Sequence, residues 1–195
     1  VLDKFELGLR FLGNDTHWPG VSAFLNLQAT SAAAFSETLS GDMQNISNIN
    51  APAGFRVANA WIAKSFAGRY GIKGGIVDLN TEFDVQTTGA VFLNASHGIG
   101  PDYSQSGLNG PAIFPSYALG AVGWGLAGDH WEWKGGVFEG TAGNPGNPGN
   151  PGEPRFLFSK GEGVLLAGEI RNRPASQTVL GLGGWMYTAA LDMLA

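Results

Sequence analysis

The segment Asp78–Pro115 reads DLNTEFDVQTTGAVFLNASHGIGPDYSQSGLNGPAIFP and decides how the rest of the chain is interpreted. It is long, polar and rich in Gly, Asn and Ser, and alternating segments flank it on both sides. Connections of this length are uncommon in a compact domain unless they carry its function. In a β-barrel such a loop can fold into the lumen and decide what passes. We therefore predict a constriction loop at residues 79–116.

The flanking segments show the period-two alternation of β-strands. In the first, Phe5, Leu7, Leu9 and Phe11 share one face, and more polar residues share the other. The eight predicted strands cover residues 5–11, 21–28, 57–66, 70–78, 117–126, 131–139, 162–171 and 178–190. Several approach the length of roughly 9–11 residues that crosses a bilayer when tilted. A soluble sheet with one solvent-exposed face has the same period, so alternation alone does not distinguish a membrane-spanning sheet from a soluble one.

Short and long connections alternate between these segments. The short ones are residues 14–20, 67–69, 127–130 and 172–177, and the long ones are residues 31–56, 79–116 and 140–161. Outer-membrane barrels have short periplasmic turns and long external loops in this alternation. If all short turns lie on one side, the strand-like piece Val91–Ala95 must belong to the loop, which leaves eight wall strands.

The composition narrows the fold class to two. Charged residues make up 14% of the chain, against roughly 25% in soluble domains, and 31 of 195 residues are Gly. The mean hydropathy is zero, and no apolar run approaches the length of about 18 residues that a spanning helix needs. These values fit an all-β, antiparallel transmembrane β-barrel, with a soluble all-β sandwich as the alternative.

The charge balance and the ligand-forming residues exclude several functions. A net charge of −5 provides no basic stripe for nucleic acid. The absence of Cys excludes disulfides and thiolate metal sites, and the three His lie in unrelated loops without metal-ligand spacing. We therefore expect no cofactor and no metal.

Two local patterns have simple structural interpretations. Gly143–Pro154 reads GNPGNPGNPGEP, which has the collagen period, but four triplets cannot sustain a triple helix, so we predict a polyproline-like external loop. Several of the six Trp lie near predicted strand ends, where aromatic girdles occur. Trp131 and Trp133 share one face beside a short turn and are the strongest girdle candidates.

Four segments together carry a family resemblance. They are AWIAKSF (Ala60–Phe66), GGIVDLNTEF (Gly74–Phe83), VFLNASHGIGPDYSQSGLNGPAIFP (Val91–Pro115) and GGVFEGTAGNPGNP (Gly135–Pro148). In this order they resemble the carbohydrate-selective porins of the OprB family, and the resemblance covers nearly the whole chain. Its most specific part runs from the NTEF sequence to the end of the third segment.

The resemblance implies a sixteen-stranded barrel in the bacterial outer membrane through which sugars diffuse passively. It implies no enzyme activity; the expected partners are small-molecule sugars and outer-membrane lipid. The family's chains are about twice as long, and this one lacks the usual terminal aromatic, so we expect residues 1–195 to be a single partial barrel domain, the N-terminal half. The missing half is then required for a closed pore, because lipid cannot satisfy open sheet edges. The start at Val1, without a signal peptide, indicates a mature or trimmed chain.

A sugar presents many hydroxyls and flat C–H faces, so a selective channel needs polar groups, aromatic surfaces and weak, multi-site binding. The candidates for pore constriction and sugar contact in the loop are Asn80, Glu82, Asp84, Asn94, Ser96, His97, Asp102, Tyr103 and Gln105. The candidates on the lumenal wall are Glu6, Arg10, Asn59 and Lys73. Arg10 and Lys73 would face acidic loop residues and set a transverse field across the constriction.

Other interpretations of the same residues remain open. Asn80, Glu82 and Asp102 could cap turns and fix the loop to the wall by hydrogen bonds instead of touching sugar. Asp78, Glu82 and Asp84 could supply the two carboxylates of a glycosidase, although their spacing does not distinguish them from ordinary loop acids. A soluble sugar-binding β-sandwich module, which would need no detergent, is the other rival.

Overall fold

The computed structural model describes residues 3–31, 41, 47–144, 146–147, 161–175 and 178–189, without the side chains of residues 90, 96, 174 and 175. The strands are β1 (Asp3–Leu12), β2 (Val21–Ser31), β3 (Gly54–Phe66), β4 (Tyr70–Val77), β5 (Ala118–Ala127), β6 (Trp131–Glu139), β7 (Val164–Ala175) and β8 (Thr178–Tyr187). The helical turns are η2 (Leu79–Thr81), η3 (Gly89–Val91), η4 (Ala95–His97) and α1 (Pro101–Ser104). None of the described helices is long and apolar enough to cross a membrane.

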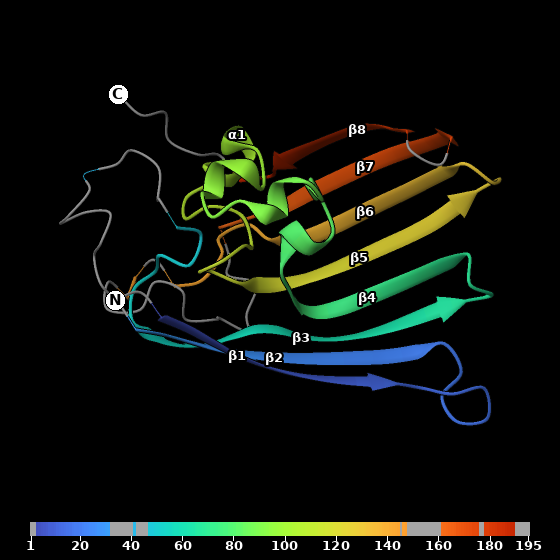
Figure 1. Ribbon diagram of the computed structural model, residues 1–195, viewed down its shortest axis with the longest axis horizontal. Coiled ribbons are helices and arrows are strands. Elements are labelled where there is room, and N and C mark those ends of the chain that lie inside the picture. The colour runs from blue at the N-terminus through green and yellow to red at the C-terminus, as the bar shows by residue number, and fades with distance from the viewer. Residues whose placement is uncertain are drawn as a thin grey trace.

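The strands form one antiparallel sheet in the order of the sequence, from β1 to β8. Each strand pairs with the next, and within the described residues β1 and β8 are edges that do not pair with each other. In Figure 1 the strand ends that flank the short turns lie at one end of the sheet, and the strand ends that flank the long connections lie at the other. The predicted fold class and the alternation of short and long connections are confirmed, and the barrel wall is unclosed.

One face of the sheet, the outer face, carries exposed apolar side chains. Phe5 and Leu9 of β1 are 67% and 59% exposed, and Ile62 of β3 and Ile72 of β4 are 65% and 55% exposed. The register keeps this face apolar across strands, because Leu9 lies opposite Leu25 and Ile62 opposite Ala23. A soluble domain rarely exposes so large an apolar surface, whereas lipid favours it.

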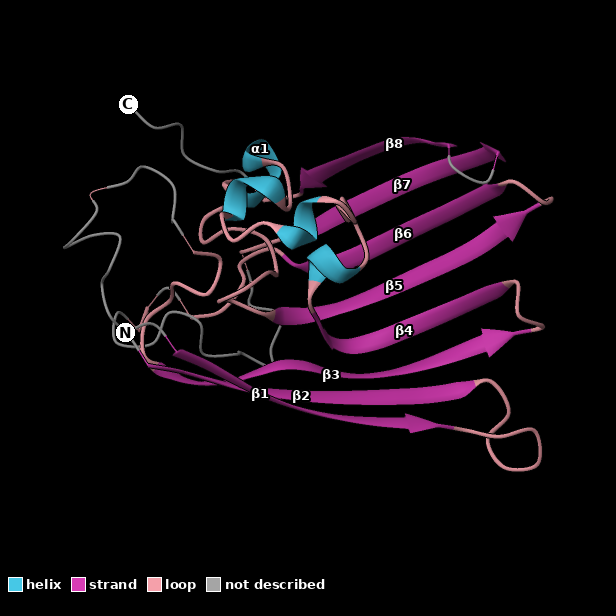
Figure 2. Ribbon diagram, in the orientation of Figure 1, coloured by secondary structure: helices cyan, strands magenta, loops and turns pink. Residues whose placement is uncertain are grey.

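The opposite face, the inner face, carries the long loop between β4 and β5. Figure 2 shows its helical turns in front of the sheet, and Leu79 of η2 and Tyr103 of α1 belong to a core cluster with side chains of β5–β8. The core lies in this layer, where Leu79, Phe83 and Tyr103 of the loop are buried with Val122 of β5 and Phe138 of β6. The hydrophobic core of this chain is therefore between the loop and the wall and not between two sheets, which does not fit a sandwich.

Strand boundaries differ from the predicted ones by a few residues. β3 starts at Gly54 because the ladder with β2 continues to the pair Thr30 and Gly54, so the preceding loop is shorter than predicted. β7 continues through a register shift to Ala175, which pairs with Thr178, so the predicted turn at residues 172–177 is too long. Val91–Ala95 contains no strand, as predicted, and runs from the last residue of η3 to the first residue of η4.

The Trp side chains divide between the two faces. Trp131 and Trp133 lie on the outer face beside a short turn and are 48% and 41% exposed, where a girdle would lie. Trp61, Trp124 and Trp185 instead lie on the inner face, so a girdle position is wrong for these three. Most of the repeat in Gly143–Pro154 lies outside the described residues, and its polyproline-like form stays a prediction.

A charge on the outer face should prevent folding into a bilayer, whereas one on the inner face should not. We expect Ile62→Lys to destabilise the protein folded in lipid by up to about 2–4 kcal/mol near the bilayer midplane. Ser22→Lys is the matched control, since Ser22 lies on the inner face opposite Ala63, the neighbour of Ile62. Folded fractions can be measured by heat-modifiable gel mobility, and equal losses in both variants would contradict the assignment of faces.

Candidate functional site

Glu82 fixes the loop to the wall through both of its carboxylate oxygens. Lys73 of β4 pairs with Oε1, and Lys134 Nζ of β6 lies 3.2 Å from Oε2. Lys134 Nζ also donates to the Glu82 carbonyl at 3.1 Å. The Glu82 and Lys73 side chains are only 11% and 12% exposed. One loop carboxylate therefore joins two non-adjacent strands.

Phe83, the next residue, adds an apolar anchor beside this ion pair. Its ring meets the Phe138 ring edge-on, with centroids 6.1 Å apart. It also lies over Gly136, where a Cβ would come within 2.8 Å of Phe83 and of Phe138. Gly136 therefore leaves the space that the loop needs to approach the sheet closely.

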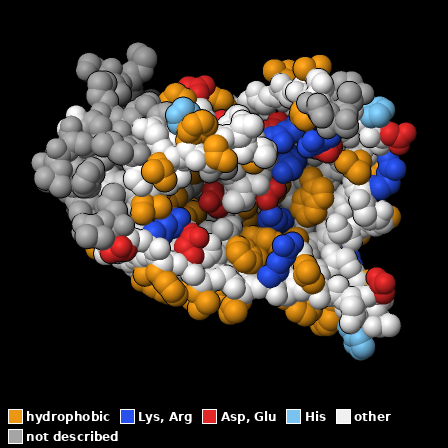
Figure 3. All heavy atoms as spheres, viewed as in Figure 1, with side chains coloured by type: hydrophobic (Ala, Val, Ile, Leu, Met, Phe, Trp, Pro, Cys, Tyr) orange, Lys and Arg blue, Asp and Glu red, His pale blue; other side chains and the backbone are white. Residues whose placement is uncertain are grey.

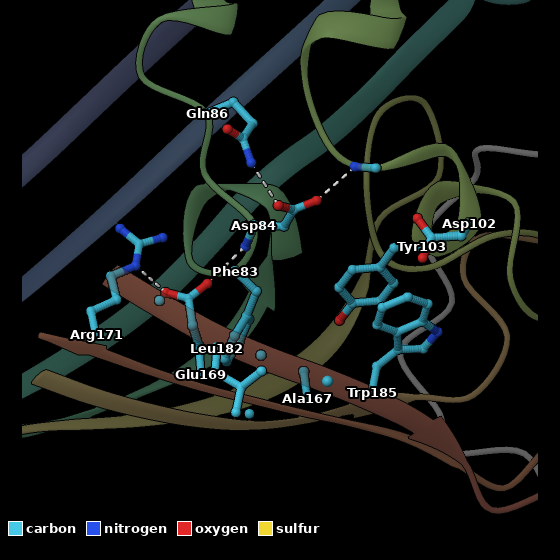
Figure 4. A pocket seen from close by; sticks show the side chains of 15 residues that line it. Phe83, Asp84, Gln86, Asp102, Tyr103, Ala167, Glu169, Arg171, Leu182 and Trp185 are labelled. Atoms are coloured by element: carbon cyan, nitrogen blue, oxygen red, sulfur yellow. Dashed lines mark hydrogen bonds and ion pairs between the residues drawn. The ribbon is translucent and has the colours of Figure 1, made fainter. Parts of the chain in front are cut away.

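Asp84 turns the loop away from the wall. Its φ is +50°, a left-handed conformation that Asp tolerates better than most residues. The Asp84 N–H donates to Glu169 Oε2 of β7 at 3.1 Å, and its Oδ2 accepts from the Gly100 N–H at 2.6 Å. Its Oδ1 accepts from Gln86 Nε2 at 2.8 Å. Figure 4 shows this network, in which Glu169 also pairs with Arg171.

A cavity of about 420 Å³, here named the loop cavity, lies between this turn and β7–β8. The loop lines it with Phe83, Asp84, Gln86, Gly100, Asp102 and Tyr103, and the wall lines it with Ala167–Glu169, Arg171 and Gly181–Trp185. Its volume lies in the range of small-molecule sites. Three carboxylates and one guanidinium surround it, and Figure 3 shows charged side chains gathered around a hollow on this face of the molecule.

Tyr103 and Trp185 form the aromatic side of the loop cavity. Their rings stack with centroids 4.2 Å apart and an interplanar angle of 10°. Tyr103 is buried, which raises the pKa of its phenol and keeps it protonated. Its hydroxyl has no hydrogen-bond partner among the described residues. A buried donor without a partner is costly, and the hydroxyl is closed to a solute in this arrangement.

The other loop candidates lie away from the loop cavity or hold the loop itself. Asn80 Nδ2 donates to the carbonyls of Phe83 and Asp84 at 3.1 Å each, so Asn80 holds the loop turn. Asn94 lines a separate hollow of about 510 Å³ towards the long-loop end, and the His97 ring contacts the Phe92 ring at a tilt of 33°, with centroids 4.4 Å apart. Gln105 is exposed, and the Ser96 side chain lies outside the described part of the structure.

The wall candidates also differ in what they contact. Lys73 faces the acidic loop residue Glu82, as predicted, whereas Arg10 is exposed and forms no ion pair with the loop in the described part of the chain. Glu6 accepts from Gln28 Nε2 at 2.6 Å. Asn59 Oδ1 accepts from the Asp78 N–H at 3.1 Å. The predicted transverse field across the constriction stays a prediction.

Sequence analysis missed Glu169, Arg171 and Trp185, which form the wall side of the loop cavity. Glu169 lies 85 residues from Asp84 in the sequence, and only alternation along β7 and β8 could have assigned these three side chains to the inner face. The described residues contain no group of three or more His, Cys, Asp or Glu that could hold a metal ion.

Comparisons with known proteins give a family and a fold. The model of the carbohydrate-selective porin OprB family matches residues 21–194. The high-pH structure of Pseudomonas putida OprB is similar with a TM-score of 0.76 and 18% sequence identity, over 96% of this chain and 46% of that chain. This chain thus spans about half the length of that porin. Curated protein sequences give no significant match.

Removing the Glu82 charge should destabilise the loop and its wall together. We expect Glu82→Gln to lower the free energy of unfolding by on the order of 3 kcal/mol, because two lysines lose their shared counter-ion in a largely buried site. Glu132→Gln is the control, since its pair with Arg173 is 35% and 48% exposed and should contribute less than about 1 kcal/mol. Urea titration in detergent micelles measures both, and equal effects would contradict the anchor.

Asp78, the N-cap of η2, should make stability depend on pH. Burial raises its pKa to about 6, although the hydrogen bond from the Asn80 N–H opposes this. The folded state then holds a proton that the unfolded state releases near pH 4, so this contribution to stability is lost as pH rises from about 4 to 6. We expect Asp78→Asn to be more stable than wild type at pH 8 and to lose that advantage by pH 4. A pH-independent difference in urea midpoint would contradict the assignment.

Proposed function

This chain belongs to the OprB family of carbohydrate-selective porins, and on that premise we propose that it forms the wall and constriction of a passive diffusion channel for sugars. The family gives it a location in the outer membrane of a Gram-negative envelope. The loop cavity is the observation that carries the proposal. It is a polar and aromatic space between the long loop and the inner face of the wall.

The loop cavity offers the two kinds of contact that a sugar needs. Asp84, Asp102 and Glu169 accept hydrogen bonds from hydroxyls, and Arg171 donates to them. The Tyr103–Trp185 stack adds an apolar surface. Several weak contacts spread over one cavity allow a solute to enter and to leave, which conduction requires.

The loop candidates then have different roles. Asp84, Asp102 and Tyr103 are the sugar-contact residues, and Glu82 and Asn80 are positioning residues that hold the loop at the wall. Lys73 is also a positioning residue, because it pairs with Glu82. Asn94 and His97 lie towards the long-loop end and would meet a solute before the loop cavity.

The channel involves no chemical step. Glu82 is neutralised by two lysines, and Asp84 is held by the Gly100 N–H and Gln86, so neither is poised as the acid or nucleophile of a glycosidase. The exposed apolar outer face argues against a soluble sugar-binding module.

A closed pore needs more strands than this chain supplies. Within the described residues, β1 and β8 each have one unpaired edge, and such edges are not tolerated in contact with lipid. We infer that residues 1–195 are one partial barrel domain and that further strands, from the same polypeptide or a partner chain, pair with both edges.

The proposal predicts selective swelling of vesicles that contain the protein at its native length. Glucose should enter faster than gluconate, an anion of similar size, because the loop cavity holds three carboxylates and one guanidinium. Arg171→Ala should slow anions further and raise cation selectivity, measured as a reversal potential. Arg173→Ala is the control, since Arg173 lies on the same strand and pairs with Glu132 instead. Equal entry of both solutes, or equal effects of the two variants, would contradict the proposed constriction.

A further inference from the structure

A second cavity, here named the turn-side cavity, lies on the other side of the Glu82 anchor. It has a volume of about 240 Å³ and shares no lining residue with the loop cavity. Trp61, Lys73, Glu82, Trp124 and Lys134 line it, together with hydroxyls of β2 and β3. Lys73, Trp124 and Lys134 all lie within four residues of the short-turn ends of their strands. This cavity is therefore nearer the short turns.

Trp124 forms a flat surface in the turn-side cavity. It lies opposite Gly71 in the register of β4 and β5. A Cβ on Gly71 would lie 2.1, 2.5 and 2.7 Å from Cζ2, Cε2 and Cη2 of the indole. The ring therefore rests directly on the Gly71 backbone, and only glycine permits this. One face of the indole is therefore covered by the wall, and Trp124 is also a lining residue of the turn-side cavity.

Polar groups surround this flat surface. Lys73 Nζ lies 4.2 Å from the centroid of the Trp61 ring and also pairs with Glu82. Lys134, which lies opposite Trp124 in the register of β5 and β6, pairs with the other oxygen of Glu82. Ser22 and Ser65 add two hydroxyls. Ammonium groups, a carboxylate and hydroxyls around one aromatic face match the equatorial hydroxyls and the apolar C–H face of a pyranose ring.

A purely structural role does not account for Trp124. A girdle Trp would lie on the outer face, as Trp133 does, and a core Trp would be covered on both faces. Trp124 remains only partly buried, although it is the largest kind of apolar side chain. Most of the side chains beside it in the cavity are charged or hydroxylated; Trp61 is aromatic, and Ala63 is the one aliphatic side chain of the lining.

We propose that the turn-side cavity is a second pyranose subsite, with Trp124 as its stacking surface and Lys73, Lys134 and the serine hydroxyls as its hydrogen-bond donors. This rests on the proposed sugar channel and adds to it a site on the short-turn side of the constriction. Short turns face the periplasm in barrels of this kind, so the subsite holds a sugar that has passed the loop.

The test measures how sugar interrupts ion current through the native-length protein in planar bilayers. Trp124→Leu removes the aromatic face but keeps an apolar side chain of moderate size. We expect it to raise the half-saturating glucose concentration about three- to tenfold, the range of aromatic contacts. Sorbitol, which lacks a rigid C–H face, should be unaffected by the substitution. Trp133→Leu is the control, because Trp133 lies on the outer face of the neighbouring strand.

Gly71→Ala gives an independent variant that keeps the tryptophan. The new Cβ displaces the indole from its place on the wall, so the glucose response should weaken as in Trp124→Leu. Unchanged glucose affinity in both folded variants, with sugar-dependent current in wild type, would overturn the subsite and leave the channel intact. Absence of any sugar response in wild type would overturn the channel and the subsite together.

Discussion

The shared carboxylate of Glu82 is the interaction on which the arrangement of the inner face depends. Its two oxygens connect β4 and β6 through one residue of the loop. The loop cavity lies on one side of this connection and the turn-side cavity on the other. Without it, the loop would be held to the wall chiefly by the contact of Phe83 with Phe138 and the hydrogen bond from Asp84 to Glu169, which fix its position less closely.

A charged anchor is an unusual choice for stability, because removing three charged groups from water is costly. Its advantage is that it fixes the position of the loop along the wall. An apolar contact such as Phe83 on Phe138 holds the loop down but tolerates sliding, whereas two lysines on separate strands define one position for the carboxylate. The pairing of Glu82 with its neighbour Phe83 combines the two effects within two residues.

Alternation and loop lengths were enough to predict the wall from the sequence. The first two strands alternate clearly, and the parity of short turns correctly made Val91–Ala95 part of the loop. The inner face was harder to predict. On β5 the inward Val122 and Trp124 alternate with outward Ala121 and Gly123, so both faces look apolar and periodicity cannot assign the Trp. The wall partners of the loop were not predictable either, because Glu169 becomes a neighbour of Asp84 only once eight strands have a register.

The separation of the anchors along the chain also sets the order in which the inner face can assemble. Lys73 lies 9 residues from Glu82, Lys134 lies 52 residues away, and Glu169 lies 85 residues from Asp84. From the 9-residue separation to the 85-residue separation, the entropic cost of closing the loop increases by about 2 kcal/mol. The nearest contact needs only β4 and the start of the loop, so docking can begin while the barrel is still an open sheet. The constriction loop can therefore dock on the wall before the barrel closes around it.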